Sequence, residues 1–151
     1  MLLRRAERID SALLESLEQR CFGRSWPAGY VQAELQARHA EFWLLQVGGM
    51  TCGYLHLLAV AGEGSLLTMG VVPEQRRIGL GRVLVEKLLA RLTELGCSAV
   101  HLEVKEGNHA ARRLYESCGF IESGRRKNYY REEGEDALLM HRALDSVKSA
   151  E

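Results

Sequence analysis

The chain has 151 residues, 46% of them hydrophobic and 26% charged, and its 20 Lys and Arg balance its 20 Asp and Glu. That length suits one domain with its own hydrophobic core, and that composition is typical of a soluble globular protein. The sequence contains no apolar run long enough to span a bilayer, so we expect no membrane partner. Because the net charge is zero, no overall field attracts the chain to nucleic acid, and we expect no direct contact with it.

Two further features bear on the compartment and on metals. The apolar pair Leu2-Leu3 is followed at once by Arg4-Arg5, which is too short for the apolar segment of a signal peptide and predicts a cytoplasmic protein. The cysteines are scattered, without the spacing of a zinc site or of a disulfide framework, and the histidines lack ligand-like spacing. We therefore predict free thiols and no bound metal. The cysteines are Cys21, Cys52, Cys97 and Cys118.

Two helices are predicted near the beginning of the chain. Residues Ala12 to Cys21 have apolar side chains at helical spacing, and Asp10-Ser11 ahead of them supplies a side-chain cap for the first amides. Ser25-Trp26-Pro27 predicts the start of a second, shorter helix with proline in its first turn, where the missing N–H costs nothing.

Three strands are predicted next. Glu41 to Val47 and Thr51 to Ala61 are rich in aromatic and branched residues, and Gly48-Gly49 between them predicts a hairpin of antiparallel strands. The run from Leu66 to Val72 is nearly all apolar, which is typical of a strand covered on both faces, and Pro73 ends it. We therefore expect this strand in the centre of a sheet.

The second half of the chain begins with a strongly amphipathic helix from Gly81 to Leu95, which Gly96 ends in a left-handed conformation. A strand from Ala99 to Val104 follows. Strand, helix and strand form a crossover unit, so we expect the two strands to be parallel. Asn108 then begins another helix, which runs to Ser117.

Two last strands, Ile121 to Tyr130 and Asp136 to Arg142, are predicted on either side of a charged turn. No repeat, low-complexity tract or linker interrupts the chain. We predict one domain over residues 1–144 and a loose C-terminal tail over 145–151.

The segment between the buried strand and the strong helix has the properties of an anion site. Backbone amides and the dipole at a helix N-terminus favour negative charge, glycine lets the chain approach a pyrophosphate without Cβ clashes, and arginines add cationic partners. The order of residues is neither a dinucleotide-binding fingerprint nor a P-loop, and a surface turn with arginines is the alternative. The segment is Arg76, Arg77, Ile78, Gly79, Leu80, Gly81 and Arg82.

The pattern Arg76-x-x-Gly79-x-Gly81 resembles the coenzyme A loop of the GNAT acetyltransferase superfamily, Q/R-x-x-G-x-G/A. Further patterns resemble the RimI-type ribosomal-protein-alanine N-acetyltransferases, so that the resemblance covers nearly the whole chain. These patterns are Asn108-x-x-Ala111-x-x-Leu114-Tyr115-Glu116-x-x-Gly119-Phe120, Gly124-x-Arg126-x-Asn128-Tyr129-Tyr130 and Glu135-Asp136-Ala137-x-x-Met140. Two departures are Met69-Gly70-Val71, where the family usually shows Ile-Ala-Val, and a shortened turn before Glu135.

The resemblance implies an α/β fold of the α+β type, with a mixed, mostly antiparallel central sheet, a parallel strand pair at the coenzyme A site and flanking helices. It implies acetyl-CoA as co-substrate and the N-terminus of a ribosomal protein as acceptor. It also implies that acetyl-CoA contacts Met69, Gly70 and Val71 on the strand, the loop from Arg76 to Arg82, and Asn108.

Attack of an amine on a thioester needs a proton acceptor, because an N-terminal amine with a pKa of about 7.7–8.0 is mostly protonated at neutral pH. On the strand before Asn108, Val100, Leu102 and Val104 point one way, while His101 and Glu103 share the opposite face. The residues alone favour an ordinary ion pair of Glu103 with an arginine. The resemblance implies that Glu103 is the general base.

Three tyrosines complete the candidate site. A phenol can supply the proton that the departing thiolate needs, and the resemblance implies this role for Tyr115, for which a packed core aromatic is the alternative. Tyr129 and Tyr130 are adjacent, so we expect that in a strand one faces inward and the other outward. They could be plain sheet residues, but the resemblance implies that they bind the acceptor peptide. Cys118 could be imagined as an acyl-carrying nucleophile, but direct transfer is preferred.

The sequence leaves three functions open. The first is acetylation of the α-amine of a ribosomal protein that begins with alanine. The second is acetylation of a small amine or a lysine side chain by a member of the same superfamily, against which the double tyrosine and Glu-Asp-Ala argue. The third is a coenzyme A-binding module without turnover, against which the presence of both Glu103 and Tyr115 argues.

Overall fold

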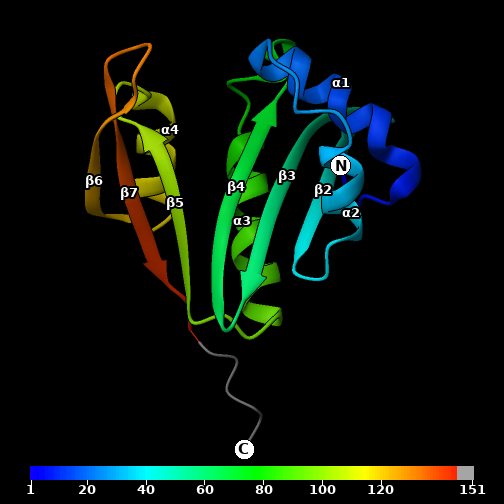
Figure 1. Cartoon of the computed structure of the whole chain (residues 1–151). Helices are drawn as coiled ribbons and strands as arrows, with labels where there is room; N and C mark the ends of the chain where they lie inside the picture. The colour runs from blue at the N-terminus through cyan, green and yellow to red at the C-terminus, as the bar shows by residue number, and fades with distance from the viewer. Residues whose placement is uncertain (146–151) are drawn as a thin grey trace, which may run out of the picture. The chain divides into compact units, whose positions relative to one another are not determined.

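The computed structural model describes residues 1–145 of the chain. The chain alternates short and long elements of both kinds (Figure 1). They are β1 (Leu2–Arg5), the 3-10 helix η1 (Arg8–Asp10), α1 (Ser11–Phe22), α2 (Tyr30–Gln36), β2 (Ala40–Val47), β3 (Met50–Val60), β4 (Glu63–Val71), the 3-10 helix η2 (Pro73–Gln75), α3 (Leu80–Glu94), β5 (Ala99–Lys105), α4 (His109–Ser117), β6 (Ile121–Tyr130) and β7 (Glu135–Ala143).

The strands form one seven-stranded sheet in the order β1-β2-β3-β4-β5-β7-β6. β4 and β5 are parallel, with Glu63 opposite Ala99 and Ser65 opposite His101. The pairs β1–β2, β2–β3, β5–β7 and β6–β7 are antiparallel. This confirms the predicted α/β fold with a mixed, mostly antiparallel sheet and one parallel pair, and β4 is central as predicted.

The chain divides into two compact units, one of residues 1–58 and 67–84 and one of residues 59–66 and 85–151. The predicted single domain over 1–144 stays a prediction, and the predicted tail lies outside the described residues from 146 onward.

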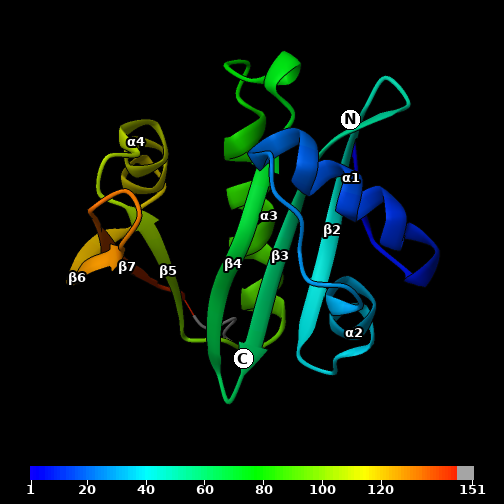
Figure 2. The same ribbon diagram turned by 45° about the horizontal axis from the view of Figure 1, so that its top comes forward.

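The hydrophobic core of the first unit lies between the β2–β3 hairpin and the helices α1 and α2. α1 and α2 lie next to each other beside β2 (Figures 1 and 2). The β2–β3 turn is Gly48-Gly49, with φ of 59° and 81°, left-handed values at which glycine has no Cβ penalty. Fully buried side chains of this core include Leu14, Leu17, Phe42, Leu44, Tyr54, Leu55 and Leu57.

Two local predictions in the first unit are wrong. Asp10 precedes α1, but its carboxylate makes no cap bond to that helix; it accepts from both Nη atoms of Arg4, at 2.7 and 2.9 Å, and from the amide of Glu7. α2 begins at Tyr30 rather than at Pro27, because Gly29 has a φ of 81° and therefore breaks any helical path from the proline. In both cases a nearby partner or backbone turn overrides the local helix signal.

In the second unit, the later part of α3 packs on the beginning of β4. A Cβ at Gly64 would lie 2.5 Å from Cδ1 of Leu92, so glycine allows this close approach. Gly96, with a φ of 81°, ends the helix as predicted, and Leu95, the last residue of the predicted helix, lies just beyond α3 and is 41% exposed. The core of this unit includes Leu88, Leu92, Val100, Phe120, Leu138 and Met140.

Candidate active site

The predicted site residues lie in both units. The β4 and loop residues, from Met69 to Arg82, belong to the first unit, and the remaining ones belong to the second. The members in the second unit are Glu103, Asn108, Tyr115, Tyr129 and Tyr130.

The loop of the first unit joins the end of β4 to the start of α3. β4 ends at Val71, the turn η2 follows, and α3, a helix of 15 residues, begins at Leu80. Arg77 and Gly79 have left-handed backbones, with φ of 67° and 88°. Arg77, Ile78 and Gly79 are exposed. Gly81 and Arg82 lie in the first turn of α3, where amides have no intrahelical partner, so the loop presents N–H groups and the positive end of the helix dipole together.

Arg76 braces this loop. Its Nε donates to the carbonyl of Val71 at 2.8 Å and its Nη2 to the carbonyl of Cys21, near the end of α1, at 2.9 Å. An ion pair of Arg20 with Glu74, at 2.5 Å, is a second link between α1 and this loop. The guanidinium predicted to meet a phosphate therefore already holds two backbone carbonyls.

The strand before the loop packs closely against α1. A Cβ at Gly70 would lie 3.0 Å from Sγ of Cys21 and 3.1 Å from a ring carbon of Phe22. Gly70, which stands where the family usually has alanine, therefore leaves room for α1 to lie close to β4 in this chain. Met69 and Val71, on either side of it, are half-buried.

In the second unit, β5 alternates as predicted. Val100, Leu102 and Val104 are buried, and His101 and Glu103 are exposed on the other face. Oε1 of Glu103 lies 3.3 Å from Nε of Arg126, and the Glu103 side chain is 34% exposed. The ion pair considered from the sequence is thus present, and it leaves Glu103 accessible to solvent.

Asn108 caps α4, as predicted: its Oδ1 accepts a hydrogen bond from the amide of Ala111 at 3.2 Å. Tyr115, on the same helix, is 7% exposed and contacts Phe120 edge-on, with ring centroids 5.8 Å apart. Burial raises the pKa of Tyr115 to about 12, so its phenol keeps its proton at neutral pH. Tyr115 is therefore a packed core aromatic, and this burial is compatible with the proposed role of proton donor because the phenol stays protonated.

Tyr129 and Tyr130 contact each other, with ring centroids 5.2 Å apart and planes at 87°. The prediction that they face opposite sides of the strand is wrong, because β6 is irregular between Arg126 and Tyr130 and Asn128 has a φ of 52°. The guanidinium of Arg126 lies 5.4 Å from the Tyr129 ring centre, and Nζ of Lys105 lies 5.0 Å from that of Tyr130.

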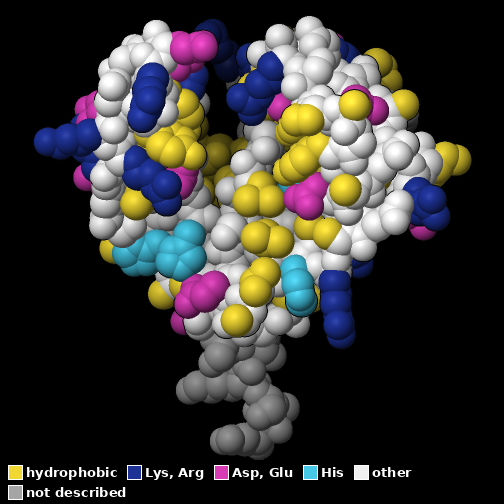
Figure 3. All heavy atoms as spheres, viewed as in Figure 1, with side chains coloured by type: hydrophobic (Ala, Val, Ile, Leu, Met, Phe, Trp, Pro, Cys, Tyr) yellow, Lys and Arg dark blue, Asp and Glu magenta, His cyan; other side chains and the backbone are white. Residues whose placement is uncertain are grey.

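Arg126 is the residue whose role sequence reasoning missed. It stands within the quoted pattern, but its contact with both Glu103 and the Tyr129 ring depends on how β6 and β5 flank β7. Figure 3 shows Lys and Arg side chains gathered over the part that contains β6 and β7, on the left of the view. The only local signal is the run of basic residues ahead of the tyrosines.

The cysteines and histidines make no metal cluster among residues 1–145: no group of three or more His, Cys, Asp or Glu there could hold an ion. All four thiols are free, and Cys118 alone is not fully buried. His56 is buried in the first unit, while His101 pairs with Glu63 at 2.9 Å. In the described part of the chain, no helix is long and apolar enough to cross a membrane.

A strand that ends in a basic, glycine-containing loop at the N-terminus of a long helix is typical of proteins that bind a diphosphate group. The chain belongs to the acetyltransferase (GNAT) family, whose model matches residues 12–120. It is therefore an acetyltransferase of that family, as the sequence resemblance predicted.

Two relatives and one solved structure show the likeness in more detail. The ribosomal protein bS18-alanine N-acetyltransferase of Escherichia coli strain K12 is 35% identical over 136 residues, 89% of this chain and 91% of the relative. The N-alpha-acetyltransferase RimI of Mycobacterium tuberculosis is 33% identical, with 89% and 87% covered. The crystal structure of the Escherichia coli ribosomal-protein-S18-alanine N-acetyltransferase superposes with a TM-score of 0.88 at 31% identity and covers 99% of this chain and 96% of its own. The RimI-type resemblance is thereby confirmed.

Proposed function

We propose that this acetyltransferase moves the acetyl group of acetyl-CoA to the α-amine of an N-terminal alanine, in a ribosomal protein of the bS18 type. The observation that carries the proposal is the likeness to the Escherichia coli enzyme of that name along nearly its whole length. An acceptor of this kind implies action in the cytoplasm, with no direct contact to nucleic acid or membrane.

The donor binds through the end of β4 and the loop from Arg76 to Arg82. The amides at the start of α3 hold the pyrophosphate, and the left-handed backbone at Gly79 turns the chain so that the loop reaches that helix end. Arg77 and Arg82 supply positive charge, and Arg76 holds the loop in shape. The backbone of Met69, Gly70 and Val71 binds the pantetheine arm and the thioester, with the Val71 amide polarising the carbonyl. Asn108 contributes a further coenzyme A contact.

The chemistry is direct transfer. Glu103 accepts a proton from the ammonium group of the peptide, directly or through water, and the free amine attacks the thioester carbonyl to form the C–N bond. The tetrahedral intermediate collapses, the C–S bond breaks, and the phenol of Tyr115 protonates the departing thiolate. The proton that the attacking nitrogen still carries passes, directly or through water, to the Tyr115 phenolate, which leaves a neutral amide and restores the phenol. Burial raises the pKa of Tyr115 to about 12, so the phenol enters the reaction protonated, as a proton donor must.

The acceptor contacts Tyr129 and Tyr130. Their phenols bind the first backbone groups of the peptide, which favours a chain end over a lysine within a chain. The aromatic pair next to Arg126, and thereby close to Glu103, supports this placement.

The test is mass spectrometry of a mixed acceptor panel incubated with acetyl-CoA. The panel contains a peptide that begins with alanine, the same peptide with a blocked N-terminus and an internal lysine, and a small polyamine. We expect rapid acetylation of the free alanine peptide and little of the other two. Gly81→Glu, which places a bulky carboxylate in the first turn of α3, is the control that should abolish transfer to every acceptor.

The outcomes separate the alternatives. Preferred acetylation of the lysine or the polyamine would replace the proposed acceptor. A folded protein that binds acetyl-CoA and acetylates nothing on the panel would favour the binding module without turnover.

A further inference from the structure

The hairpin of β6 and β7 carries a bulge that begins beside the tyrosine pair. Arg126 is opposite Ala137, and the next residues in register are Tyr130 and Glu135, so β6 advances four residues where β7 advances two. The additional residues bend β6 out of a regular pleat. This bend is the physical reason why the rings of Tyr129 and Tyr130 meet.

Asp136 holds the bulge from the opposite strand. Its Oδ1 accepts the amide of Asn128 at 2.7 Å, and Asn128 has a left-handed φ of 52°. A left-handed conformation is unfavourable for most L-residues and tolerable for asparagine, so a charge-assisted hydrogen bond to its amide stabilises it. Asp136 thus stabilises the left-handed backbone of Asn128, the residue that directly precedes the tyrosine pair.

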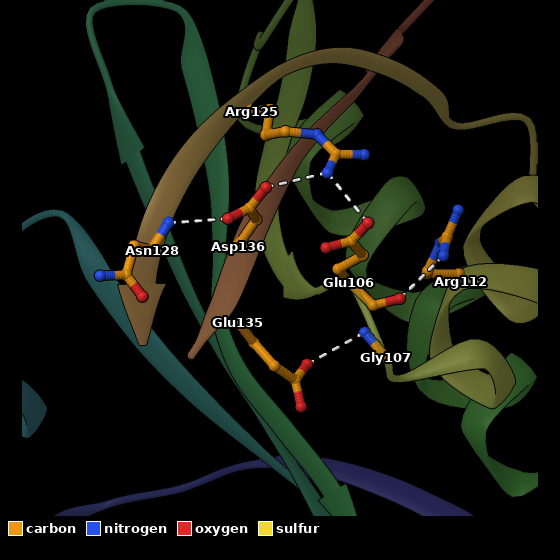
Figure 4. A network of polar contacts seen from close by, with 7 residues as sticks. All are labelled: Glu106, Gly107, Arg112, Arg125, Asn128, Glu135 and Asp136. Carbon is orange, nitrogen blue, oxygen red and sulfur yellow. Dashed lines mark hydrogen bonds and ion pairs between the residues drawn. The ribbon is translucent and has the colours of Figure 1, made fainter. Parts of the chain in front are cut away.

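Asp136 is itself fixed by a chain of ion pairs. Its Oδ2 lies 2.9 Å from Nη1 of Arg125, which lies 2.9 Å from Oε1 of Glu106 (Figure 4). The Asn128 amide, and after it Arg125, holds the pKa of Asp136 below its usual range, so its carboxylate is charged at neutral pH. The backbone adds a further link, from the amide of Glu106 to the carbonyl of Asp136 at 3.0 Å.

Glu135, the preceding residue, makes a separate contact with the segment before α4. Its Oε2 accepts the amide of Gly107 at 3.0 Å, and a Cβ at Gly107 would lie 3.0 Å from that oxygen. Gly107 directly precedes Asn108, the cap of α4. Figure 4 shows the two acidic side chains of β7 turned to different partners, Glu135 to Gly107 and Asp136 to Asn128 and Arg125.

We propose that Asp136 is a positioning residue for the acceptor site: it sets the Asn128 bulge and thereby the orientation of Tyr129 and Tyr130. It acts through these tyrosines and not on the reacting atoms. The inference rests on the proposed function in so far as the tyrosines bind the acceptor. The bulge itself does not depend on that function.

The kinetic test compares Asp136→Ala with Asp136→Asn and with Glu132→Gln, a control that removes a carboxylate from the turn of the same hairpin. Loss of a charge-assisted hydrogen bond corresponds to about a tenfold or larger change in an equilibrium constant. We expect Asp136→Ala to raise the KM of the alanine peptide by about that factor, with the Kd of acetyl-CoA unchanged. Asp136→Asn keeps an acceptor for the Asn128 amide and should show a smaller effect.

Rescue tests the bulge directly. Asn128→Gly removes the penalty of the left-handed backbone, so the double variant Asp136→Ala/Asn128→Gly should regain part of the lost peptide affinity. If Asp136→Ala only lowered the stability of the fold, Asn128→Gly would not specifically restore the KM of the peptide. Equal peptide KM in wild type, Asp136→Ala and Glu132→Gln would overturn the kinetic role of Asp136.

A structural readout keeps the inference separate from the proposed function. Fluorine NMR of protein that contains 3-fluorotyrosine gives signals for its five tyrosines, and Tyr→Phe variants assign those of Tyr129 and Tyr130. We expect Asp136→Ala to shift these two signals and leave those of Tyr30 and Tyr54 in place. Unmoved Tyr129 and Tyr130 signals would refute the positioning role, whereas moved signals with unchanged peptide kinetics would refute the acceptor role of the tyrosines.

Discussion

Arg76 donates a hydrogen bond from Nη2 to the carbonyl of Cys21 at 2.9 Å, which ties the loop after β4 to the end of α1. Its Nε also donates to the carbonyl of Val71, so one side chain in the loop is bonded both to the end of β4 and to the end of α1. If acetyl-CoA binds at this loop as proposed, Arg76 contributes to that binding through the shape of the loop, besides any charge it offers.

We therefore predict that Arg76→Ala weakens acetyl-CoA binding by about tenfold, the order of one lost hydrogen bond from a charged group. The dependence of that affinity on salt should change little. Arg77→Ala, at the exposed neighbouring position, is the matched control: it should reduce the salt dependence, because exposed charges act through screened electrostatics. Titration calorimetry at two ionic strengths measures both quantities. An equal loss of salt dependence in both variants would assign Arg76 to the phosphates instead.

Gly70 gives a second prediction about the same junction. In Gly70→Ala the new Cβ would meet Sγ of Cys21 at 3.0 Å, and overpacking of this kind costs about 1–3 kcal/mol. We expect urea unfolding to show a lower free energy of unfolding for Gly70→Ala. Cys21→Ala removes the sulfur, so the double variant should be destabilised by less than the sum of the two single changes. Additive effects would mean that the two residues do not interact.

His56 predicts a dependence of stability on pH. The ring is fully buried against Phe42, with centroids 3.9 Å apart, and Nε2 lies 3.1 Å from Glu34 Oε1 but neither ring nitrogen makes a hydrogen bond. Burial lowers the pKa of His56 to about 4, whereas an unfolded histidine has a pKa of about 6.5. The unfolded chain therefore binds the proton first. The free energy of unfolding should fall as the pH drops below 6.5, and the fall should end near pH 4.

Between pH 7 and pH 5 this group accounts for a loss of about 2 kcal/mol. Urea unfolding at both pH values measures it. In His56→Leu, which keeps an apolar side chain against Phe42, the difference between the two pH values should shrink by about that amount. The carboxylates contribute less in this window, because an ordinary Asp or Glu titrates at about 4. An unchanged difference in the variant would refute the buried neutral ring.

Predictions from local sequence are confirmed where no distant partner or backbone turn intervenes, and they fail where one does. The amphipathic pattern of α3 and the capping of α4 by Asn108 are local and were correct. Asp10 leaves its helix because Arg4, on a strand, binds it. The register of β6 against β7 cannot be read from β6 alone, because the residue that holds its bulge, Asp136, lies on the other strand.

The candidate site divides in the same way. Family patterns selected its residues, and alternation along β5 placed Glu103 on the exposed face correctly. The partners of these residues came from tertiary pairing: Arg126 for Glu103, and Cys21 for both Gly70 and Arg76. The contact between Glu103 and Arg126 does not by itself distinguish a general base from an ordinary ion pair. Substitution of each partner in turn makes that distinction.

The pair of Glu103 and Arg126 provides that test. If Glu103 accepts the proton of the amine, Glu103→Gln keeps its shape but removes the base, and kcat should fall by about 10²- to 10⁴-fold with the Kd of acetyl-CoA unchanged. Arg126→Gln removes the ion pair, at 3.3 Å, and leaves the carboxylate in place, so its kcat should change far less. If the pair were only structural, the two variants would lose similar activity, since either one breaks the same contact. The pH–rate profiles provide the second readout: the acidic limb of kcat/KM should persist in Arg126→Gln, whereas in Glu103→Gln it should follow the ionisation of the peptide amine, with a pKa of about 7.7–8.0. A Glu103→Gln enzyme with wild-type rate and an unaltered profile would exclude Glu103 as the base and leave the ion pair as its function.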